Sequence, residues 1–173
     1  KKRRAAAVVR EKKRRAAALA AIKNKSVCIR SAKGQWVVVE DNQKNVTATS
    51  KKCGLRETFI IRSNTIQNMH WKTYLSCRPD GRLEGGIKNP SSSEQIKVIG
   101  PRRDKYVLRC MAHGKKFLVA MYGGGKELRA DRPKTNTWET FRIEPAGAAA
   151  RAAAYKDAAA REKKRKADAA ARA

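Results

Sequence analysis

Tyr106–Ile143 reads YVLRCMAHGKKFLVAMYGGGKELRADRPKTNTWETFRI. This stretch contains a short apolar run, a basic glycine turn, an aromatic and aliphatic run, a polar run that ends on a small residue, and a closing Glu followed by an aromatic run. Val27–Ile61 repeats the order with VCIRS, WVVVE, NVTA and ETFII, and Met69–Val98 repeats it more loosely with YLSC, GRLEGG and EQIKV. The sequence is therefore built from three related copies.

The three copies have a period of about 40 residues. The aromatic residues that begin the second apolar run of each copy are spaced 38 and 43 residues apart: Trp36, Tyr74 and Phe117. The residues that follow the closing Glu are spaced 37 and 45 apart: Phe59, Ile96 and Phe141. Such a period indicates units that bury their apolar faces against one another. The pattern predicts an all-β core, a single β-trefoil.

Short strands and frequent turns are expected throughout the repeats. The triplet Gly123–Gly125 lacks the Lys and Ser or Thr of a phosphate-binding loop, so we expect it to form a hairpin tip. The predicted strands cover residues 27–30, 36–39, 46–49, 59–62, 73–77, 82–85, 95–99, 106–110, 117–121, 128–130 and 140–143.

Composition divides the chain into three parts, residues 1–25, 26–146 and 147–173. The two terminal parts are rich in Ala, Lys and Arg, which favour helix, so we expect helices over about 5–22 and 148–172. On the first helix, the stripe that starts at Val8 is interrupted by Lys12 and Arg15. A helix without a continuous apolar stripe is not expected to pack on the trefoil or to lie in a membrane.

The repeats resemble the fascin-like β-trefoil family. The resemblance is carried by VCIRSAKGQWVVVE and YVLRCMAHGKKFLVA, which are followed by ETFII and WETFRI, and it covers residues 26–146. The second repeat departs from the pattern where Asn68–Trp71 replaces the Arg-Ser segment. The resemblance implies a β-trefoil. Trefoils of this kind occur in actin-bundling proteins, carbohydrate binders and nuclear RNA-associated proteins, so the fold does not select a function.

The chain is strongly basic, with 42 Lys and Arg against 15 Asp and Glu and a formal net charge of +27. Residues 1–25 contribute +10, residues 147–173 contribute +5, and the trefoil carries +12. A net charge this far from zero favours a polyanionic partner. Nucleic acid is the first candidate, and an anionic membrane or acidic polymer is the second.

Four cysteines lie at positions 28, 53, 77 and 110, without a close pair. Zinc sites usually contain closely spaced pairs, so the sequence predicts no metal, and no other cofactor. We expect reduced, buried thiols, which are typical of cytosolic and nuclear proteins. The two histidines, His70 and His113, fall in separate repeats, and no nucleophile or base pairs with them in the sequence. The protein is therefore not expected to be an enzyme.

Basic clusters in both tails and in three trefoil turns are the candidate site. Because no RNA-recognition motif accompanies them, the sequence predicts phosphate contacts without base readout. The Ala-rich tails resemble the extensions of ribosomal proteins in composition. We therefore predict a structural rRNA-binding component of the ribosome, with rRNA and neighbouring ribosomal proteins as partners, in the cytoplasm with nuclear or nucleolar transit. The predicted RNA contacts are Lys12, Lys13, Arg14, Arg15, Lys51, Lys52, Arg102, Arg103, Lys115, Lys116, Lys163, Lys164, Arg165 and Lys166.

Two other functions are compatible with the fold. A cytoskeletal protein that binds actin or microtubules is one alternative, because these filaments are also acidic. A sugar-binding trefoil is the other. It would need exposed aromatic residues beside acidic or amide groups in each repeat, and the sequence pattern shows no such set.

Overall fold

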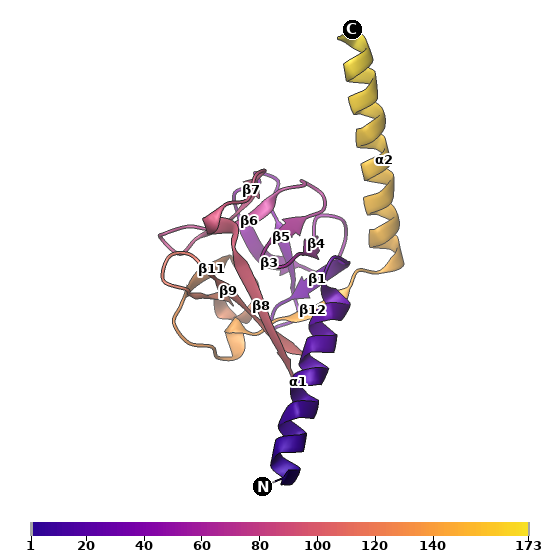
Figure 1. The fold of residues 1–173 in the computed structure, drawn as a ribbon. Coiled ribbons are helices and arrows are strands. Elements are labelled where there is room, and N and C mark those ends of the chain that lie inside the picture. Colours follow the sequence, from indigo (N-terminus) through magenta and orange to yellow (C-terminus); the bar gives the residue numbers. More distant parts are fainter. Residues whose placement is uncertain (1, 173) are drawn as a thin grey trace.

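A computed structural model describes residues 2–172 of the chain, so the predicted domain limits at residues 1 and 173 lie outside the described residues. Within this range, twelve strands lie between two long helices (Figure 1). The elements are α1 (Lys2–Ile22), β1 (Ser26–Arg30), β2 (Trp36–Val39), β3 (Val46–Ser50), β4 (Thr58–Ile61), β5 (Ile66–Asn68), β6 (Tyr74–Cys77), β7 (Leu83–Ile87), β8 (Ile96–Arg102), β9 (Lys105–Cys110), β10 (Phe117–Ala120), β11 (Leu128–Arg132), β12 (Arg142–Pro145) and α2 (Ala148–Ala171).

The first and last strands of each repeat form a closed barrel. β1 pairs with both β4 and β12, β4 pairs with β5, and β8 pairs with β9, all antiparallel. The Ile96 N–H donates to the Asn64 carbonyl oxygen at 2.7 Å and joins the second repeat to itself. A bridge between Tyr106 and Phe141 joins β9 to β12 and completes the ring. Closure removes the exposed sheet edges.

The middle strands of each repeat form three hairpins, β2–β3, β6–β7 and β10–β11. Backbone hydrogen bonds connect the hairpins in a triangle. The donor and acceptor pairs are Gly85 N–H to Gln43 O at 3.1 Å, Ala130 N–H to Gly81 O at 2.8 Å and Ala48 N–H to Lys126 O at 2.9 Å. The three aromatic residues that defined the period, Trp36, Tyr74 and Phe117, are the first residues of β2, β6 and β10. The predicted single β-trefoil is confirmed.

The closing Glu has the same local role in every repeat. Its carboxylate accepts a hydrogen bond from a backbone N–H three residues earlier, which ties off a tight turn. The pairs are Gly54 N to Glu57 at 3.0 Å, Ser91 N to Glu94 at 2.6 Å and Asn136 N to Glu139 at 2.7 Å. Two residues further along, Phe59, Ile96 and Phe141 are each at most 1% exposed and lie in one shared core. The closing Glu therefore stabilises a turn, and the residue two positions later is buried in the core.

The structure contains one strand that the sequence analysis did not predict. The second repeat begins with β5, which the sequence analysis missed because this strand is short and its pattern, IQN, is mostly polar. Asn68 is fully buried there, and its Oδ1 accepts hydrogen bonds from the His70 and Trp71 N–H groups at 3.0 Å each. The side chain therefore holds the turn that follows β5.

The terminal helices extend from the trefoil in opposite directions, with the two chain ends far apart (Figure 1). Most of α1 is exposed, and Val8 is 68% exposed. Its last turn differs from the expectation of an unpacked helix: Ile22 is buried, Leu19 packs against the core, and the Asn24 N–H donates to the Ile61 oxygen at 2.8 Å. Two apolar side chains one turn apart are enough to dock the end of a helix.

The cysteines form two disulfides, so the prediction of reduced thiols is wrong. Cys28 on β1 bonds to Cys53 in the loop after β3, within the first repeat. Cys77 on β6 bonds to Cys110 on β9 and links the second repeat to the third. The Cα atoms are 6.2 and 6.3 Å apart, within the usual range for a disulfide. The bonded cysteines are 25 and 33 positions apart in the sequence and become neighbours only in the folded trefoil.

Candidate functional site

Two large aromatic side chains are exposed on the third repeat of the trefoil. Tyr122 is 51% exposed and Trp138 is 39% exposed. They lie on two short 3-10 helices, Met121–Gly123 and Thr137–Glu139, and their ring centroids are 5.9 Å apart at an interplanar angle of 54°. The Lys126 ammonium lies 4.7 Å from the centroid of the Tyr122 ring. Together they form an aromatic surface edged by a cation, which we call the aromatic pair.

The glycine turn predicted as a hairpin tip positions this pair. Tyr122 has a φ of +58°, and the glycines that follow continue the left-handed backbone. At Gly123, an added Cβ would lie 3.0 Å from Trp138 Cδ1. The indole therefore rests directly on the glycine backbone, an approach that a larger residue would obstruct.

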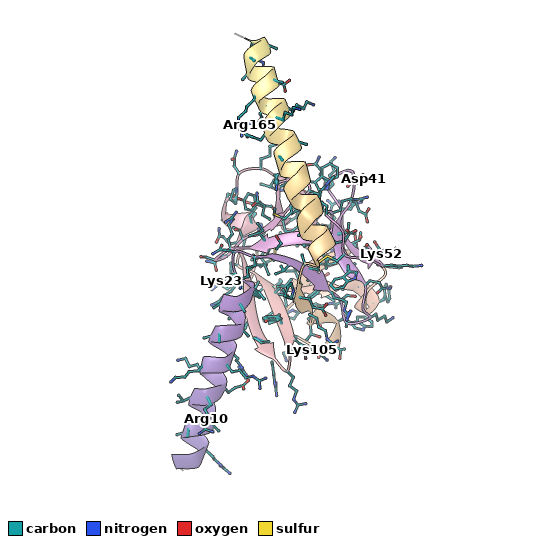
Figure 2. All side chains as sticks on the ribbon, turned by 90° about the vertical axis from the view of Figure 1, so that its right-hand side faces the viewer. Arg10, Lys23, Asp41, Lys52, Lys105 and Arg165 are labelled. Atoms are coloured by element: carbon teal, nitrogen blue, oxygen red, sulfur yellow. A yellow bond between two sulfur atoms is a disulfide. The ribbon has the colours of Figure 1, made fainter. Side chains whose placement is uncertain are left out.

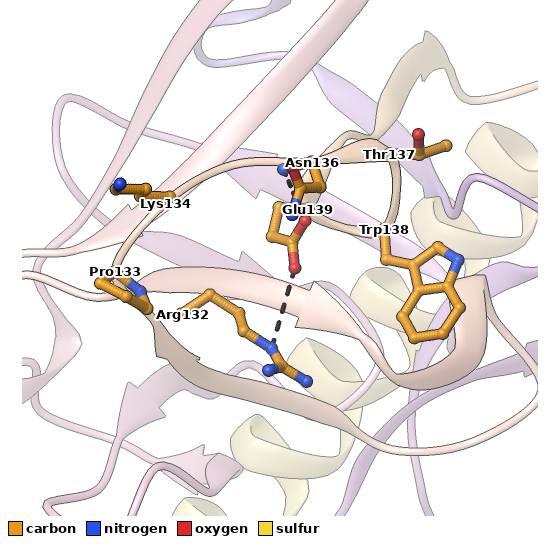
Figure 3. A pocket seen from close by; sticks show the side chains of 7 residues that line it. All are labelled: Arg132, Pro133, Lys134, Asn136, Thr137, Trp138 and Glu139. Atoms are coloured by element: carbon orange, nitrogen blue, oxygen red, sulfur yellow. Dashed lines mark hydrogen bonds and ion pairs between the residues drawn. The ribbon is translucent and has the colours of Figure 1, made fainter.

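A pocket of about 500 Å³ opens beside Trp138 (Figure 3). Figure 3 shows the Arg132 guanidinium and the Glu139 carboxylate directed into the space next to the indole. Glu139 is buried, and its Oε1 lies 3.8 Å from Arg132 Nε. The other carboxylate oxygen accepts a hydrogen bond from the Asn136 N–H, so Glu139 holds the loop. Arg132 Nε lies nearer to the Asp131 carboxylate, at 3.4 Å. The lining residues are Arg132, Pro133, Lys134, Asn136, Thr137, Trp138 and Glu139.

The other two repeats do not carry an aromatic pair at the corresponding positions. In the first repeat, the residues that correspond to Tyr122 and Trp138 are Asp41 and Arg56, and they form an ion pair at 3.1 Å. Arg56 also lies 3.5 Å from Glu40. In the second repeat, Ser93 precedes the closing Glu. The pseudo-threefold positions thus carry an aromatic pair only in the third repeat of the described trefoil, although all three backbones form the same turn.

The predicted RNA contacts on the helices are exposed and far apart. Lys12, Lys13, Arg14 and Arg15 lie on α1, where Arg15 Nε bonds to Glu11 at 2.9 Å. Lys163–Lys166 lie on α2, where Arg165 and Lys166 each approach Glu162 at 3.7 Å. Figure 2 shows Arg10 of α1 and Arg165 of α2 on opposite sides of the trefoil.

The predicted contacts on the trefoil belong to three separate turns. Lys51 and Lys52 follow β3, Arg102 and Arg103 lie at the β8–β9 turn, and Lys115 and Lys116 lie at the β9–β10 turn. All are exposed except Lys116, which is half-buried. None of these six residues lines the pocket beside Trp138. The structure does not bring the predicted contacts into one surface.

The described residues hold no set of three or more His, Cys, Asp or Glu side chains placed to share a metal ion. Across residues 2–172, no helix has both the length and the apolar composition needed to cross a membrane.

No protein-family model matches the sequence, and no curated protein matches it. Solved structures do match. A ricin B-like lectin from Macrolepiota procera in complex with lactose matches with a TM-score of 0.60 at 14% identity, covering 71% of this chain and 96% of the lectin. The designed threefold-symmetric protein ThreeFoil matches with a TM-score of 0.60 at 14% identity, covering 69% of this chain and 97% of ThreeFoil. A mosquitocidal holotoxin matches with a TM-score of 0.65 at 15% identity, covering 73% of this chain and 18% of the toxin. At these identities the likeness establishes the β-trefoil fold.

These comparisons contradict the prediction of a ribosomal protein with rRNA and ribosomal proteins as partners. The three similar structures named above are a lectin, a designed protein and a toxin, and none of these three is a ribosomal protein. Positive charge attracts any polyanion, so the charge count could not specify RNA. The sequence analysis also missed Tyr122 and Trp138. The available signal was the closing motif, in which Trp138 stands where the first repeat has Arg56.

Proposed function

We propose that the protein is a carbohydrate-binding β-trefoil and that a sugar ring stacks on Trp138 in the third repeat. The observation that carries this proposal is the exposed aromatic pair beside a polar pocket. A sugar ring has an apolar C–H face and a rim of hydroxyls. An exposed indole can cover the face while amide, hydroxyl and guanidinium groups bind the rim. The lactose complex of the similar lectin supports this assignment.

Each residue has a distinct role in this proposal. Trp138 is the stacking surface, and Tyr122 packs beside it. The exposed side chains of Asn136 and Thr137 offer an amide and a hydroxyl to the rim of the sugar. Arg132 adds a donor that lies near the carboxylates of Asp131 and Glu139. The proposed activity is binding without chemical conversion of the sugar.

The two disulfides support an oxidising compartment, such as the cell exterior, as the place where the protein acts. We propose this location in place of the cytoplasm. The finer assignment to the fascin-like branch of the trefoils is also a proposal, and it is supported by Glu-Thr-Phe at Glu57–Phe59 and again at Glu139–Phe141.

Titration of the full chain with a panel of neutral and charged oligosaccharides, followed by tryptophan fluorescence, tests the proposal. Trp138→Ala should weaken binding by about tenfold or more, because the stacking surface is lost. Arg56→Ala is the matched control: it changes the corresponding residue of the first repeat and should leave the affinity unchanged. Because Trp138→Ala removes the reporting indole, its affinity is measured by calorimetry. Equal affinities of Trp138→Ala and the unmodified protein would refute the assignment of the site to Trp138. No binding to any oligosaccharide would refute the function.

A further inference from the structure

A second cavity, of about 250 Å³, lies between the first and third repeats. Thr137 lines both this cavity and the pocket beside Trp138, so the two adjoin. The Lys33 N–H also donates to the Gly123 oxygen at 2.8 Å, and this bond ties the loop of the first repeat to the turn that seats Trp138. The position of the second cavity relative to the aromatic pair is therefore fixed by the backbone.

The cavity between the repeats is lined by four cationic side chains and by no acidic one: Arg30, Lys33, Lys105 and Arg142. Arg30 is partly neutralised by Glu144 at 3.6 Å, and Arg142 is partly neutralised by Asp104 at 3.4 Å. Among the described residues, no ion pair involves Lys33 or Lys105, and both are exposed. The cavity thus keeps at least two uncompensated positive charges.

One neutral donor completes the lining. Ser31 also lines the cavity, but its hydroxyl oxygen is buried and lies beside Gly124, so it is closed to a ligand. The exposed Thr137 adds a hydroxyl at the boundary with the aromatic pocket. Guanidinium, ammonium and hydroxyl donors around one small cavity match the several acceptor oxygens of a sulfate or carboxylate group.

We propose that this cavity binds an anionic substituent, a sulfate or a carboxylate, of the glycan whose ring stacks on Trp138. This inference rests on the proposed function and gives it a substrate class, acidic glycans. The sugar ring supplies the apolar contact, and the charged substituent reaches across Thr137 into the cavity. Uncompensated charge at Lys33 and Lys105 makes an acidic glycan a better ligand than a neutral one of the same length.

The test compares three tetrasaccharides: a sulfated heparin fragment, its desulfated and N-acetylated form that keeps only carboxylates, and neutral chitotetraose. The unmodified full chain should bind the acidic ligands about tenfold more tightly than the neutral one. The double variant Lys33→Gln/Lys105→Gln should lose this preference and keep its affinity for the neutral ligand. The control, Lys51→Gln/Lys52→Gln, removes the same charge from a turn outside the cavity and should keep the preference. Single Lys33→Gln serves if the double variant does not fold.

The outcomes separate the two proposals. Preference for the sulfated fragment alone assigns the cavity to sulfate, and equal preference for the carboxylate form assigns it to anionic substituents in general. If the preference survives in Lys33→Gln/Lys105→Gln, or falls equally in the Lys51 and Lys52 control, the anionic cavity is wrong. Equal binding of acidic and neutral ligands by the unmodified chain also overturns it, while sugar binding itself stands. Failure of all three ligands to bind, together with the wider panel, refutes sugar binding.

Discussion

Removal of either disulfide should destabilise the trefoil by several kcal/mol. The bonds close chain segments of 25 residues between Cys28 and Cys53 and 33 residues between Cys77 and Cys110. In the chain-entropy treatment, these lengths correspond to about 3.5 and about 3.7 kcal/mol of restriction on the unfolded state. For a domain of this size, each loss lowers the unfolding midpoint by about 10–20 °C.

The measurement is thermal unfolding, followed by circular dichroism, of the unmodified chain and of two double variants, Cys28→Ala/Cys53→Ala and Cys77→Ala/Cys110→Ala. Each is run with and without a thiol reductant. Cys53 is half-buried, whereas Cys77 and Cys110 are each 1% exposed, so limited reduction should open the Cys28–Cys53 bond first. Alkylation and mass spectrometry identify the freed thiols. The Cys28→Ala/Cys53→Ala variant should respond to reductant only when the second bond is reached.

Four alkylatable thiols in protein purified without reductant would refute the disulfide assignment. If the bonds are present but full reduction leaves the midpoint unchanged, the entropic reasoning is wrong for this fold.

Two further predictions concern turns of the trefoil. Gly124→Ala should lower the unfolding midpoint and weaken sugar binding, because φ is +138° and the new Cβ would collide with the Gln35 side chain. Gly114→Ala is the control: φ is +86° and the new Cβ would meet only the Lys116 side chain at 3.6 Å, so it should cost only backbone strain of about 1 kcal/mol and leave binding intact. Burial opposes ionisation of Glu94, but the Ser76 hydroxyl, together with hydrogen bonds from the Ser91 N–H and hydroxyl, outweighs it and holds the pKa below its ordinary value of 4.5. The stability that the ionised Glu94 contributes is therefore present above about pH 5 and is lost as the pH falls through the lowered pKa. The difference in unfolding midpoint between the unmodified chain and Glu94→Gln should therefore become smaller in acid. A difference that does not change with pH would contradict this reasoning.

The fold could be predicted from sequence because its repeats are carried by core anchors with fixed positions. The core anchors Phe59, Ile96 and Phe141 each follow a closing Glu by two residues. The half-buried Trp36, Tyr74 and Phe117 each begin a strand. The weak point was the second repeat, where Asn68 is fully buried and its side chain bonds to backbone groups. A polar residue can be buried when its side chain forms hydrogen bonds with backbone groups, but in a sequence the same residue suggests a loop.

The site and the disulfides depend on contacts that no local pattern encodes. Tyr122 and Trp138 meet because a left-handed turn brings two segments together, and the chain between them gives no periodic signal. The pairing of Cys28 with Cys53 likewise depends on the fold of the first repeat. Net charge was the most visible feature of the sequence. It indicates that the protein attracts anions, but it does not describe the shape of a binding site that would select one anion over another.

The two terminal helices also determine how the molecule moves in solution. α1 has 21 residues and α2 has 24, so at 1.5 Å per residue they are about 31 and 36 Å long. Each is about as long as a small domain is wide, and they extend in opposite directions from the trefoil (Figure 1). The two helices make the molecule elongated, which raises its frictional coefficient in solution. A chain of 19.3 kDa with this shape diffuses more slowly and elutes earlier in gel filtration than a sphere of the same mass.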